Sequence, residues 1–375
     1  MREIKVGVIG AGFMGKTHIF GYKTIPLYYE PKYKIKLEGI CSKTLQNAQK
    51  AKDLYDFNFA TDNEDDIFSN KNIDVINICT PDAFHRAQIL KSLDAGKHIY
   101  CEKPLISCGQ SAAEILGHSN LNKVTTRAVF HNRFFANVIR AKQIIDEGRL
   151  GKILAFRGQF LLCSNAKSTT PAGWRNDSSK SAGNGVLHGV GSHISDMIYY
   201  LLGDFAKVYA KIQMPYPIRP DGEGGTVQCI TDEAAYIIAT LKNGAMGTIE
   251  ATKLATGAAT NMKLEINGEK GALIIDLVQP NWLFFYDNTL PDEKLGGYKG
   301  YTRIECIQNY DTQLTFPPGK HPIGWIRAHV HSLYDFIEGV AAGKQVAPSI
   351  KDGLYIQHVL DTAMQSARQN KELEI

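Results

Sequence analysis

The chain has 375 residues, of which 44% are hydrophobic and 21% are charged, and its net charge is +4. This composition predicts a globular protein with room for two domains, and the small charge gives no indication of nucleic-acid binding. The seven cysteines form no CxxC pair, no apolar run is long enough to cross a membrane, and the N-terminus has no signal-peptide pattern. We therefore expect a cytoplasmic protein with no metal centre and with neither membrane nor nucleic acid as a partner.

Short apolar strands alternate with helices through the first third of the chain. We expect strands at IKVGVIG, KIKLEGIC, DVINICT, HIYC and VTTRAVF, and helices at GKTHIFGYKTI, LQNAQKAKDLY, AFHRAQILKSLDAG and GQSAAEILGHSN. This alternation predicts an α/β fold with a doubly wound parallel sheet, in which ligands bind at the carboxyl ends of the strands.

The segment GAGFMG directly follows the first expected strand and directly precedes the first expected helix. Its glycines, Gly10, Gly12 and Gly15, have the GxGxxG spacing of a dinucleotide-binding loop. Without Cβ atoms the backbone N–H groups can approach a pyrophosphate, and the helix N-terminus favours negative charge. We expect this loop, including Phe13 and Met14, to bind NAD or NADP.

The end of the second strand bears on the choice between these two cofactors. An acid that binds the adenosine ribose is expected there, but the strand ends in Cys41, Ser42 and Lys43, and Glu38 lies several residues too early. Ser42 and Lys43 can accept a 2′-phosphate, although a lysine in a loop is almost as often only solvated. Both NAD and NADP therefore remain open.

Two more strand ends carry polar residues to the same edge of the sheet. The first is TPDAFH, with Thr80, Pro81 and His85, and the second is CEKP, with Glu102 and Lys103. A dinucleotide that crosses this edge brings its nicotinamide towards Glu102 and Lys103. A partly buried lysine there would have a lowered pKa, suited to proton relay or to polarising a substrate oxygen. A structural Glu–Lys pair explains the position equally well.

The second half begins with a Gly/Ser-rich loop that leads into an amphipathic helix, SHISDMIYYLL, near whose start lies His193. Alternating apolar and polar residues around Asn243–Gly244 then predict an antiparallel hairpin. Two amphipathic helices follow. The first of them carries Trp325, His329 and His331, which are candidates for a substrate cleft, and for Trp325 we favour packing in the core.

The chain resembles the Gfo/Idh/MocA oxidoreductase family in a set of segments that occur in the same order. These are GAGFMG with His18, ICTPDAFH, AGKHIYCEKPL, HNRFFANVIRAKQIIDEGRLGKI, GWRND and GVGSHISDMIYYLLG. The resemblance implies a Rossmann domain over residues 1–128 and an α/β domain over residues 129–375. The second domain would have a large, open, mostly antiparallel sheet that often forms homodimers or homotetramers. It also implies that Lys103 and His193 are catalytic and that Asn132 contacts the cofactor. One position departs from the pattern, because Gly189 stands where such dehydrogenases commonly have an aspartate.

The leading hypothesis is an NAD(P)-dependent oxidoreductase that acts on a secondary hydroxyl of a sugar, glycoside or cyclitol, with a 3-keto-glycoside as one conceivable product. His193 would take the hydroxyl proton and Lys103 would polarise or relay, while Trp174, Arg175 and His188 would bind the polyol. Without the aspartate, His193 would act alone or with a carboxylate from elsewhere. Redox-assisted glycoside cleavage with a retained cofactor and a non-catalytic dinucleotide sensor are the alternatives. The sugar, the oxidised carbon, the direction and the oligomer number stay open.

Overall fold

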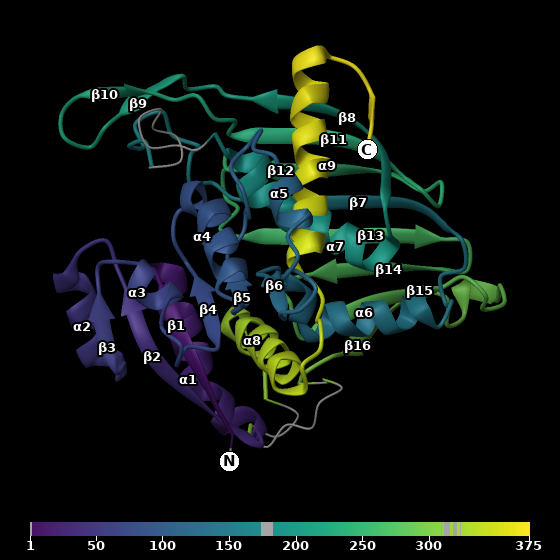
Figure 1. Cartoon of the computed structure of the whole chain (residues 1–375). Helices are drawn as coiled ribbons and strands as arrows, with labels where there is room; N and C mark the ends of the chain where they lie inside the picture. Colours follow the sequence, from purple (N-terminus) through teal and green to yellow (C-terminus); the bar gives the residue numbers. More distant parts are fainter. Residues whose placement is uncertain (1, 174–182, 309, 311–315, 318–320, 323) are drawn as a thin grey trace. The chain divides into compact units, whose positions relative to one another are not determined.

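The computed structural model describes residues 2–173, 183–308, 310, 316–317, 321–322 and 324–375 (Figure 1). The chain divides into two compact units. The first contains residues up to Phe134 together with Gly324–Tyr355, and the second contains Phe135–Tyr310 together with Ile356–Ile375. The last boundary falls within the helix α9 (Ile350–Gln369), most of which belongs to the second unit. This division differs from the contiguous domains expected over 1–128 and 129–375, because the chain returns to the first unit for a helix near its C-terminal end.

A six-stranded parallel sheet forms the centre of the first unit, with the strand order β3-β2-β1-β4-β5-β6. The expected alternation of strands and helices is confirmed, with a further short strand, β3, and a short helix, α3, that show too few residues for a periodic pattern. The elements are β1 (Arg2–Ile9), α1 (Phe13–Tyr29), β2 (Tyr33–Cys41), α2 (Leu45–Tyr55), β3 (Phe59–Thr61), α3 (Asp65–Phe68), β4 (Val75–Ile78), α4 (Asp82–Asp94), β5 (His98–Cys101), α5 (Ala113–Leu116), β6 (Thr126–Ala128), the 3-10 turn η1 (His131–Phe134) and α8 (Trp325–Ala342).

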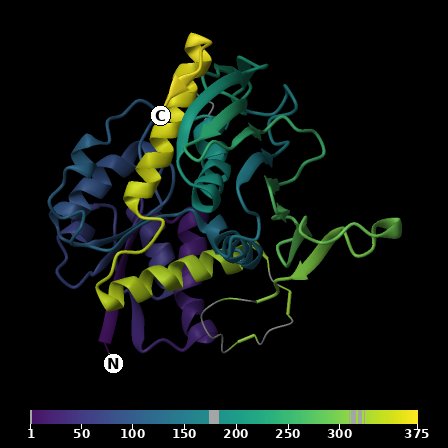
Figure 2. The same cartoon turned by 90° about the vertical axis from the view of Figure 1, so that its right-hand side faces the viewer.

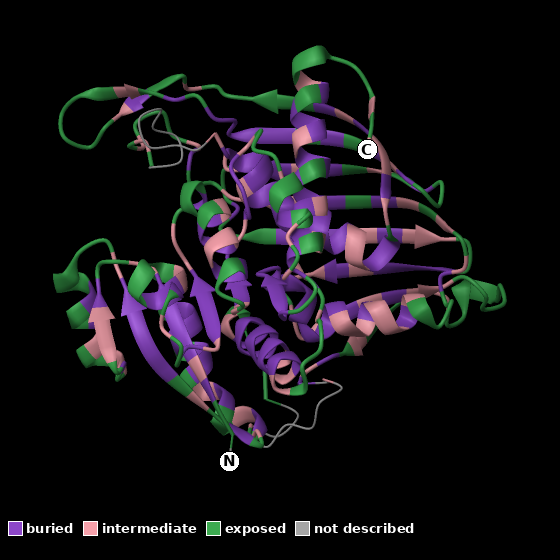
Figure 3. Cartoon of the chain, viewed as in Figure 1, coloured by how far each residue is buried: buried purple, intermediate pink, exposed green. Residues whose placement is uncertain are grey.

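Helix α8 belongs to the first unit because its apolar side chains complete the core there. Val330, Leu333 and Phe336 are fully buried in one cluster with residues of β1 and α1. Gly21 of α1 permits the close approach, since a Cβ atom at this position would lie 2.4 Å from Cδ1 of Leu333. Figures 1 and 2 show α8 beside α1, and Figure 3 shows that most of it is buried. Each large side chain buried in this way contributes about 1.5–3 kcal/mol.

A nine-stranded mixed sheet forms the second unit, with the order β16-β15-β14-β13-β7-β12-β11-β8-β17. Only the β7–β12 pair is parallel among the paired strands of this sheet in the described residues, so the expected, mostly antiparallel sheet is confirmed. The elements are α6 (Ala136–Asp146), β7 (Ile153–Leu161), the π-helical turn η2 (Leu187–Gly191), α7 (Ser192–Leu202), β8 (Phe205–Gln213), β9 (Ile218–Pro220), β10 (Thr226–Gln228), β11 (Ala234–Leu241), β12 (Met246–Thr252), β13 (Asn261–Gly268), β14 (Gly271–Asp276), β15 (Trp282–Asp287), η3 (Lys294–Gly296), β16 (Tyr301–Glu305), α9 (Ile350–Gln369) and β17 (Leu373–Glu374).

Helices pack against one face of this sheet. Helix α7 lies close to β7 at Gly158, where a Cβ atom would be 2.8 Å from Cγ1 of Ile194, and α9 is tied to β8 because Ser366 Oγ accepts the Ala210 N–H at 3.0 Å. The expected hairpin is present as β11 and β12, joined at Asn243–Gly244. In the described part of the chain, no helix is both long and apolar enough to span a membrane.

Candidate active site

The loop between β1 and α1 contains three glycines that are required for different reasons. Gly10 has φ +103°, and a Cβ atom there would lie 2.6 Å from the carbonyl oxygen of Cys79. A Cβ atom at Gly15 would lie 2.1 Å from the carbonyl oxygen of Gly10. At Gly12, the residue that precedes α1, a Cβ atom would meet nothing within 4 Å. Gly10 and Gly15 therefore keep the loop compact, while Gly12 leaves open backbone at a helix N-terminus, which fits a dinucleotide pyrophosphate.

Two loops at the carboxyl edge of the same sheet are joined through His85. This side chain is buried, with Nε2 2.8 Å from the carbonyl oxygen of Thr80 and Nδ1 2.7 Å from that of Pro104. The Thr80 hydroxyl in turn donates to Gln88 Oε1 at 2.6 Å. His85, which we expected near the cofactor, thus connects the loop after β4 to the loop after β5, so its side chain supports the edge on which Thr80 and Pro81 lie.

The end of β2 has the polar character that the sequence indicates. Ser42 is half-buried, its N–H donating to the Thr61 carbonyl at 3.2 Å, and Lys43 is exposed. Glu38 lies within the strand, is buried, and accepts a hydrogen bond from Asn58 Nδ2 at 2.7 Å. Because Glu38 already has this partner and lies inside the sheet, it does not replace the ribose-binding acid.

The Glu102–Lys103 loop lies over a buried polar cluster at the ends of β4 and β5. Glu102 is buried, and its Oε1 lies 3.2 Å from Nε2 of His18, which is completely buried on α1. Its other oxygen, Oε2, accepts the backbone N–H of Lys103 at 3.3 Å. The second ring nitrogen of His18, Nδ1, lies 3.1 Å from Sγ of Cys79 and 3.2 Å from Nδ2 of Asn77. The cluster therefore joins α1 to both strand ends beneath Lys103.

The surroundings of His18 determine its charge. Burial alone lowers the pKa of an imidazole, but the neighbouring Cys79 and Glu102 side chains outweigh burial and raise the pKa of His18 to about 10. Tyr100 packs edge-on against the ring at 5.0 Å. These two neighbours therefore favour the cationic form of His18, whose ring faces the Glu102 carboxylate.

The N-terminal end of α8 adds an aromatic group to this edge. The ring of His329 stacks on that of His131 at 3.7 Å and contacts Trp325 at 4.4 Å, and Trp325 stacks on Phe13 at 5.8 Å. Burial, together with the neighbouring His131, His18 and Lys103 side chains, holds the pKa of His329 well below its usual range. Trp325 is 40% exposed, so the expectation that it packs in the core is wrong: its ring covers His329 at the surface.

Asn132 lies in η1, the 3-10 turn that follows β6, and its side chain is buried. This places it after the carboxyl end of a strand of the parallel sheet, as expected for a residue near the cofactor. His331, the third candidate on α8, is also buried, and its Nδ1 lies 2.7 Å from the Tyr29 hydroxyl. It therefore has a structural contact within the helix pair.

The second unit carries the expected catalytic histidine at the start of α7. His193 is buried, and its ring centre lies 5.8 Å from that of Phe160 on β7. The turn before it, η2, is π-helical, and Gly189 lies inside that turn. Trp174 and Arg175, the expected polyol-binding residues, lie outside the described residues.

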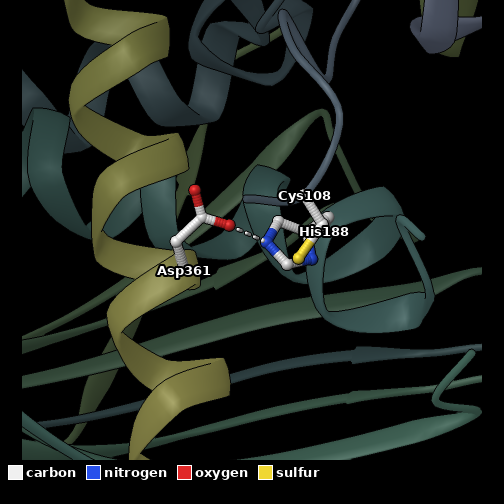
Figure 4. Close-up of side chains that lie close together, drawn as sticks. All are labelled: Cys108, His188 and Asp361. Carbon is white, nitrogen blue, oxygen red and sulfur yellow. Dashed lines mark hydrogen bonds and ion pairs between the residues drawn. The ribbon is translucent and has the colours of Figure 1, made fainter. Parts of the chain in front are cut away.

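Asp361 of α9 is a carboxylate from elsewhere in the chain, but it pairs with His188, whereas a carboxylate partner was expected for His193. Nε2 of His188 lies 2.8 Å from Oδ1 of Asp361, as Figure 4 shows, and His188 is completely buried. Asp232 also faces this histidine. Burial raises the pKa of Asp232, against the lowering effect of the Leu187 N–H and of His188. An imidazole held by a carboxylate has a defined orientation. The second unit therefore contains an Asp–His pair, but its histidine is His188 and not the expected catalytic His193.

Two family models match the chain. The oxidoreductase family with an NAD-binding Rossmann fold matches residues 4–130, and the GFO/IDH/MocA C-terminal domain matches residues 138–274. The chain belongs to the Gfo/Idh/MocA oxidoreductase family. The resemblance noted in the sequence is thereby confirmed, together with the oxidoreductase class and a Rossmann fold of the NAD-binding type.

Relatives of this Gfo/Idh/MocA protein match over its whole length. Levoglucosan dehydrogenase of Pseudarthrobacter phenanthrenivorans is 28% identical and covers 100% of this chain and 99% of its own, and inositol 2-dehydrogenase of Rhizobium meliloti is 24% identical over 99% of each. Among solved structures, levoglucosan dehydrogenase in complex with NADH and levoglucosan superposes with a TM-score of 0.93, at 27% identity over 100% of this chain and 99% of the other.

Sequence reasoning gave no role to Asn77 and Cys79 and used His18 only for the family resemblance. The available signal was a histidine on the buried stripe of α1, since His18, Tyr22, Ile25 and Tyr29 recur at helical spacing and are all buried. A histidine at such a position is usually a core residue. Only the folded chain shows that a carboxylate of the Glu102–Lys103 loop faces it.

Proposed function

We propose that this protein is an NAD-dependent dehydrogenase that oxidises a secondary hydroxyl group of a cyclic sugar, glycoside or cyclitol. The observation that carries the proposal is the position of Lys103. It follows the carboxyl end of β5, on a loop anchored by Glu102 and His85, at the same sheet edge as the open backbone of Gly12. Full-length similarity to levoglucosan dehydrogenase and inositol 2-dehydrogenase supports a ring-shaped polyol as substrate.

The proposed oxidation removes a hydride from the substrate carbon and a proton from its hydroxyl group. Bound NAD would accept the hydride from the carbon that carries the hydroxyl. His193 would accept the hydroxyl proton as a neutral base, and Lys103 would polarise the oxygen as the carbonyl forms. The product is a keto sugar, keto-glycoside or ketocyclitol, with two hydrogens fewer than the substrate.

We assign His188, held by Asp361, a role in binding or orienting the polyol. With Nε2 directed to the carboxylate, the ring has one orientation and one favoured tautomer. Because Gly189 has no carboxylate, we assign the orienting acid of the second unit to Asp361.

A substrate panel tests the proposal. Purified protein is incubated with levoglucosan, methyl glucosides, glucose 6-phosphate or myo-inositol, each with NAD or NADP, and the absorbance of the reduced cofactor is followed. Mass spectrometry then identifies a product that is lighter by two hydrogens. Lys103→Met is the matched control, since it should retain the fold and lose turnover.

The same experiment separates the alternatives. Release of an aglycone without accumulation of reduced cofactor would indicate redox-assisted glycoside cleavage with a retained cofactor. Tight cofactor binding without any turnover would favour a dinucleotide sensor.

We also propose that the protein works as a homodimer or homotetramer. On β11, Tyr236 and Ile238 are 44% and 50% exposed on the face opposite the buried residues Ala235 and Ile237. Exposed apolar side chains on a strand that is paired on both sides favour association with a second copy. Light scattering on wild type and on Ile238→Lys measures the oligomeric state. A monomeric wild type would contradict the proposed homodimer or homotetramer.

A further inference from the structure

His18 lies at the meeting point of the two segments that the proposed reaction needs. It is on α1, two turns beyond Gly12, and is completely buried. Its Nε2 lies 3.2 Å from Glu102 Oε1, and Glu102 precedes Lys103. One buried contact therefore connects the helix that begins at the cofactor loop with the loop that carries Lys103.

We infer that His18 is a positioning residue, which holds the Glu102 carboxylate so that this carboxylate fixes the backbone and the electrostatic surroundings of Lys103. The inference rests on the proposed function of Lys103. Its structural basis is the use of both Glu102 oxygens: Oε1 faces His18, and Oε2 accepts the Lys103 N–H at 3.3 Å. On its other side the loop is held by His85, which contacts the Pro104 carbonyl at 2.7 Å.

The other groups around His18 act on its charge in different ways. Cys79 raises its pKa, whereas the Asn77 amide nitrogen, a donor 3.2 Å from Nδ1, favours an unprotonated Nδ1. Cys79 Sγ, at the end of β4, lies 3.1 Å from Nδ1, and Asn77 joins the cluster to the Tyr22 hydroxyl, which donates to Asn77 Oδ1 at 3.0 Å. Tyr100 from β5 presents only its ring. From α8, His329 lies 6.0 Å away, and its pKa is held so low that it adds no positive charge. The cation therefore has Glu102 as its carboxylate partner in the described cluster.

Removing His18 and removing Glu102 should change the net charge beside Lys103 in opposite directions. Without the histidine cation, in His18→Gln, the Glu102 carboxylate is left to act on Lys103 and should raise the pKa of its amine. Without the carboxylate, in Glu102→Gln, the His18 cation should lower that pKa. The double variant should come close to wild type, because both charges are gone. A contact that served only to fill space would not produce shifts of opposite sign.

Competitive acetylation measures this independently of turnover. Intact protein is treated with trace acetic anhydride across a pH series, and mass spectrometry quantifies the peptide that contains Lys103, which reports the pKa of its amine. In parallel, kcat and KM on the active substrate of the panel and the Kd for NAD are determined. The matched control is His331→Gln, another buried histidine of the first unit, which contacts Tyr29 away from this cluster.

We expect His18→Gln to lower kcat by roughly 10- to 100-fold, the scale of a slightly misplaced catalytic group. The Kd for NAD should change less than about threefold, because its proposed phosphate contacts lie at Gly12. His331→Gln should lower the melting temperature without moving the Lys103 titration. Unchanged Lys103 titration in both His18→Gln and Glu102→Gln, or a kcat for His18→Gln near that of wild type, would overturn the inference. If wild type oxidises none of the polyols, the proposed function fails, whereas opposite shifts in the acetylation data would still support the positioning role.

Discussion

Replacing Gly12 with valine separates the cofactor-binding role of the glycine loop from its structural role. A Cβ atom at Gly12 meets nothing within 4 Å, and the backbone at φ −75°, ψ −161° is extended and open to any residue. We therefore expect Gly12→Val to change the free energy of unfolding by no more than about 0.5 kcal/mol, as at other unobstructed surface positions. In the presence of NAD, the new side chain should occupy the space that the pyrophosphate needs.

Gly15→Ala is the matched comparison in the same loop. Its Cβ atom would lie 2.1 Å from the Gly10 carbonyl oxygen, far inside van der Waals contact, so the loop must move. Overpacking of this kind costs about 1–3 kcal/mol. The two variants should therefore have different defects: Gly12→Val should lose NAD binding, and Gly15→Ala should lose stability.

Thermal melting with and without NAD, together with calorimetric titration, measures both effects. At an NAD concentration 100 times its Kd, wild type should gain about 2.7 kcal/mol of stability. Gly12→Val should melt like wild type without NAD and gain almost nothing with it, and Gly15→Ala should melt at a lower temperature without NAD. A Gly12→Val protein that binds NAD with wild-type affinity would refute the assignment of this loop as the pyrophosphate site.

Three further predictions follow from the site. Replacing Ser42 with aspartate should favour NAD over NADP by repelling a 2′-phosphate, and an unchanged ratio of the two dissociation constants would place the ribose elsewhere. Lys103→Met and His193→Ala should each lower kcat by about 100-fold or more while the Kd for NAD stays nearly constant, and the double variant should lose much less than the product, as expected of groups that act together. A Lys103→Met protein with normal turnover but a lower melting temperature would favour the structural pair instead. Because the pKa of His18 is raised from 6.5 to about 10, its contribution to stability is fully present below about pH 6.5 and declines as the pH rises to about 10. The difference in melting temperature between wild type and His18→Gln should accordingly shrink from pH 6.5 to pH 10, and a constant difference would contradict this charge state.

Features that depend on residues adjacent in the chain could be predicted from the sequence. The strand, glycine loop and helix at the N-terminus form one continuous segment, and the requirement for close backbone approach is encoded in Gly10, Gly12 and Gly15 themselves. The same holds for the β11–β12 hairpin, where Gly244 has φ +89°, and for α7, whose apolar residues Ile194, Met197, Ile198 and Leu201 recur at helical spacing. Local backbone preferences and periodicity carry this information, so no distant partner is needed to read it.

Features that depend on distant segments became visible only in the folded chain. Helix α8 was expected in the second domain, but its apolar face packs on α1, roughly 300 positions earlier in the chain. For the same reason the pairing of His188 with Asp361 could not be predicted, and neither could the charge of His18, which depends on a carboxylate supplied by another loop. A side chain's chemistry is specified by its type, whereas its pKa and its partner are set by the neighbours that tertiary packing brings to it.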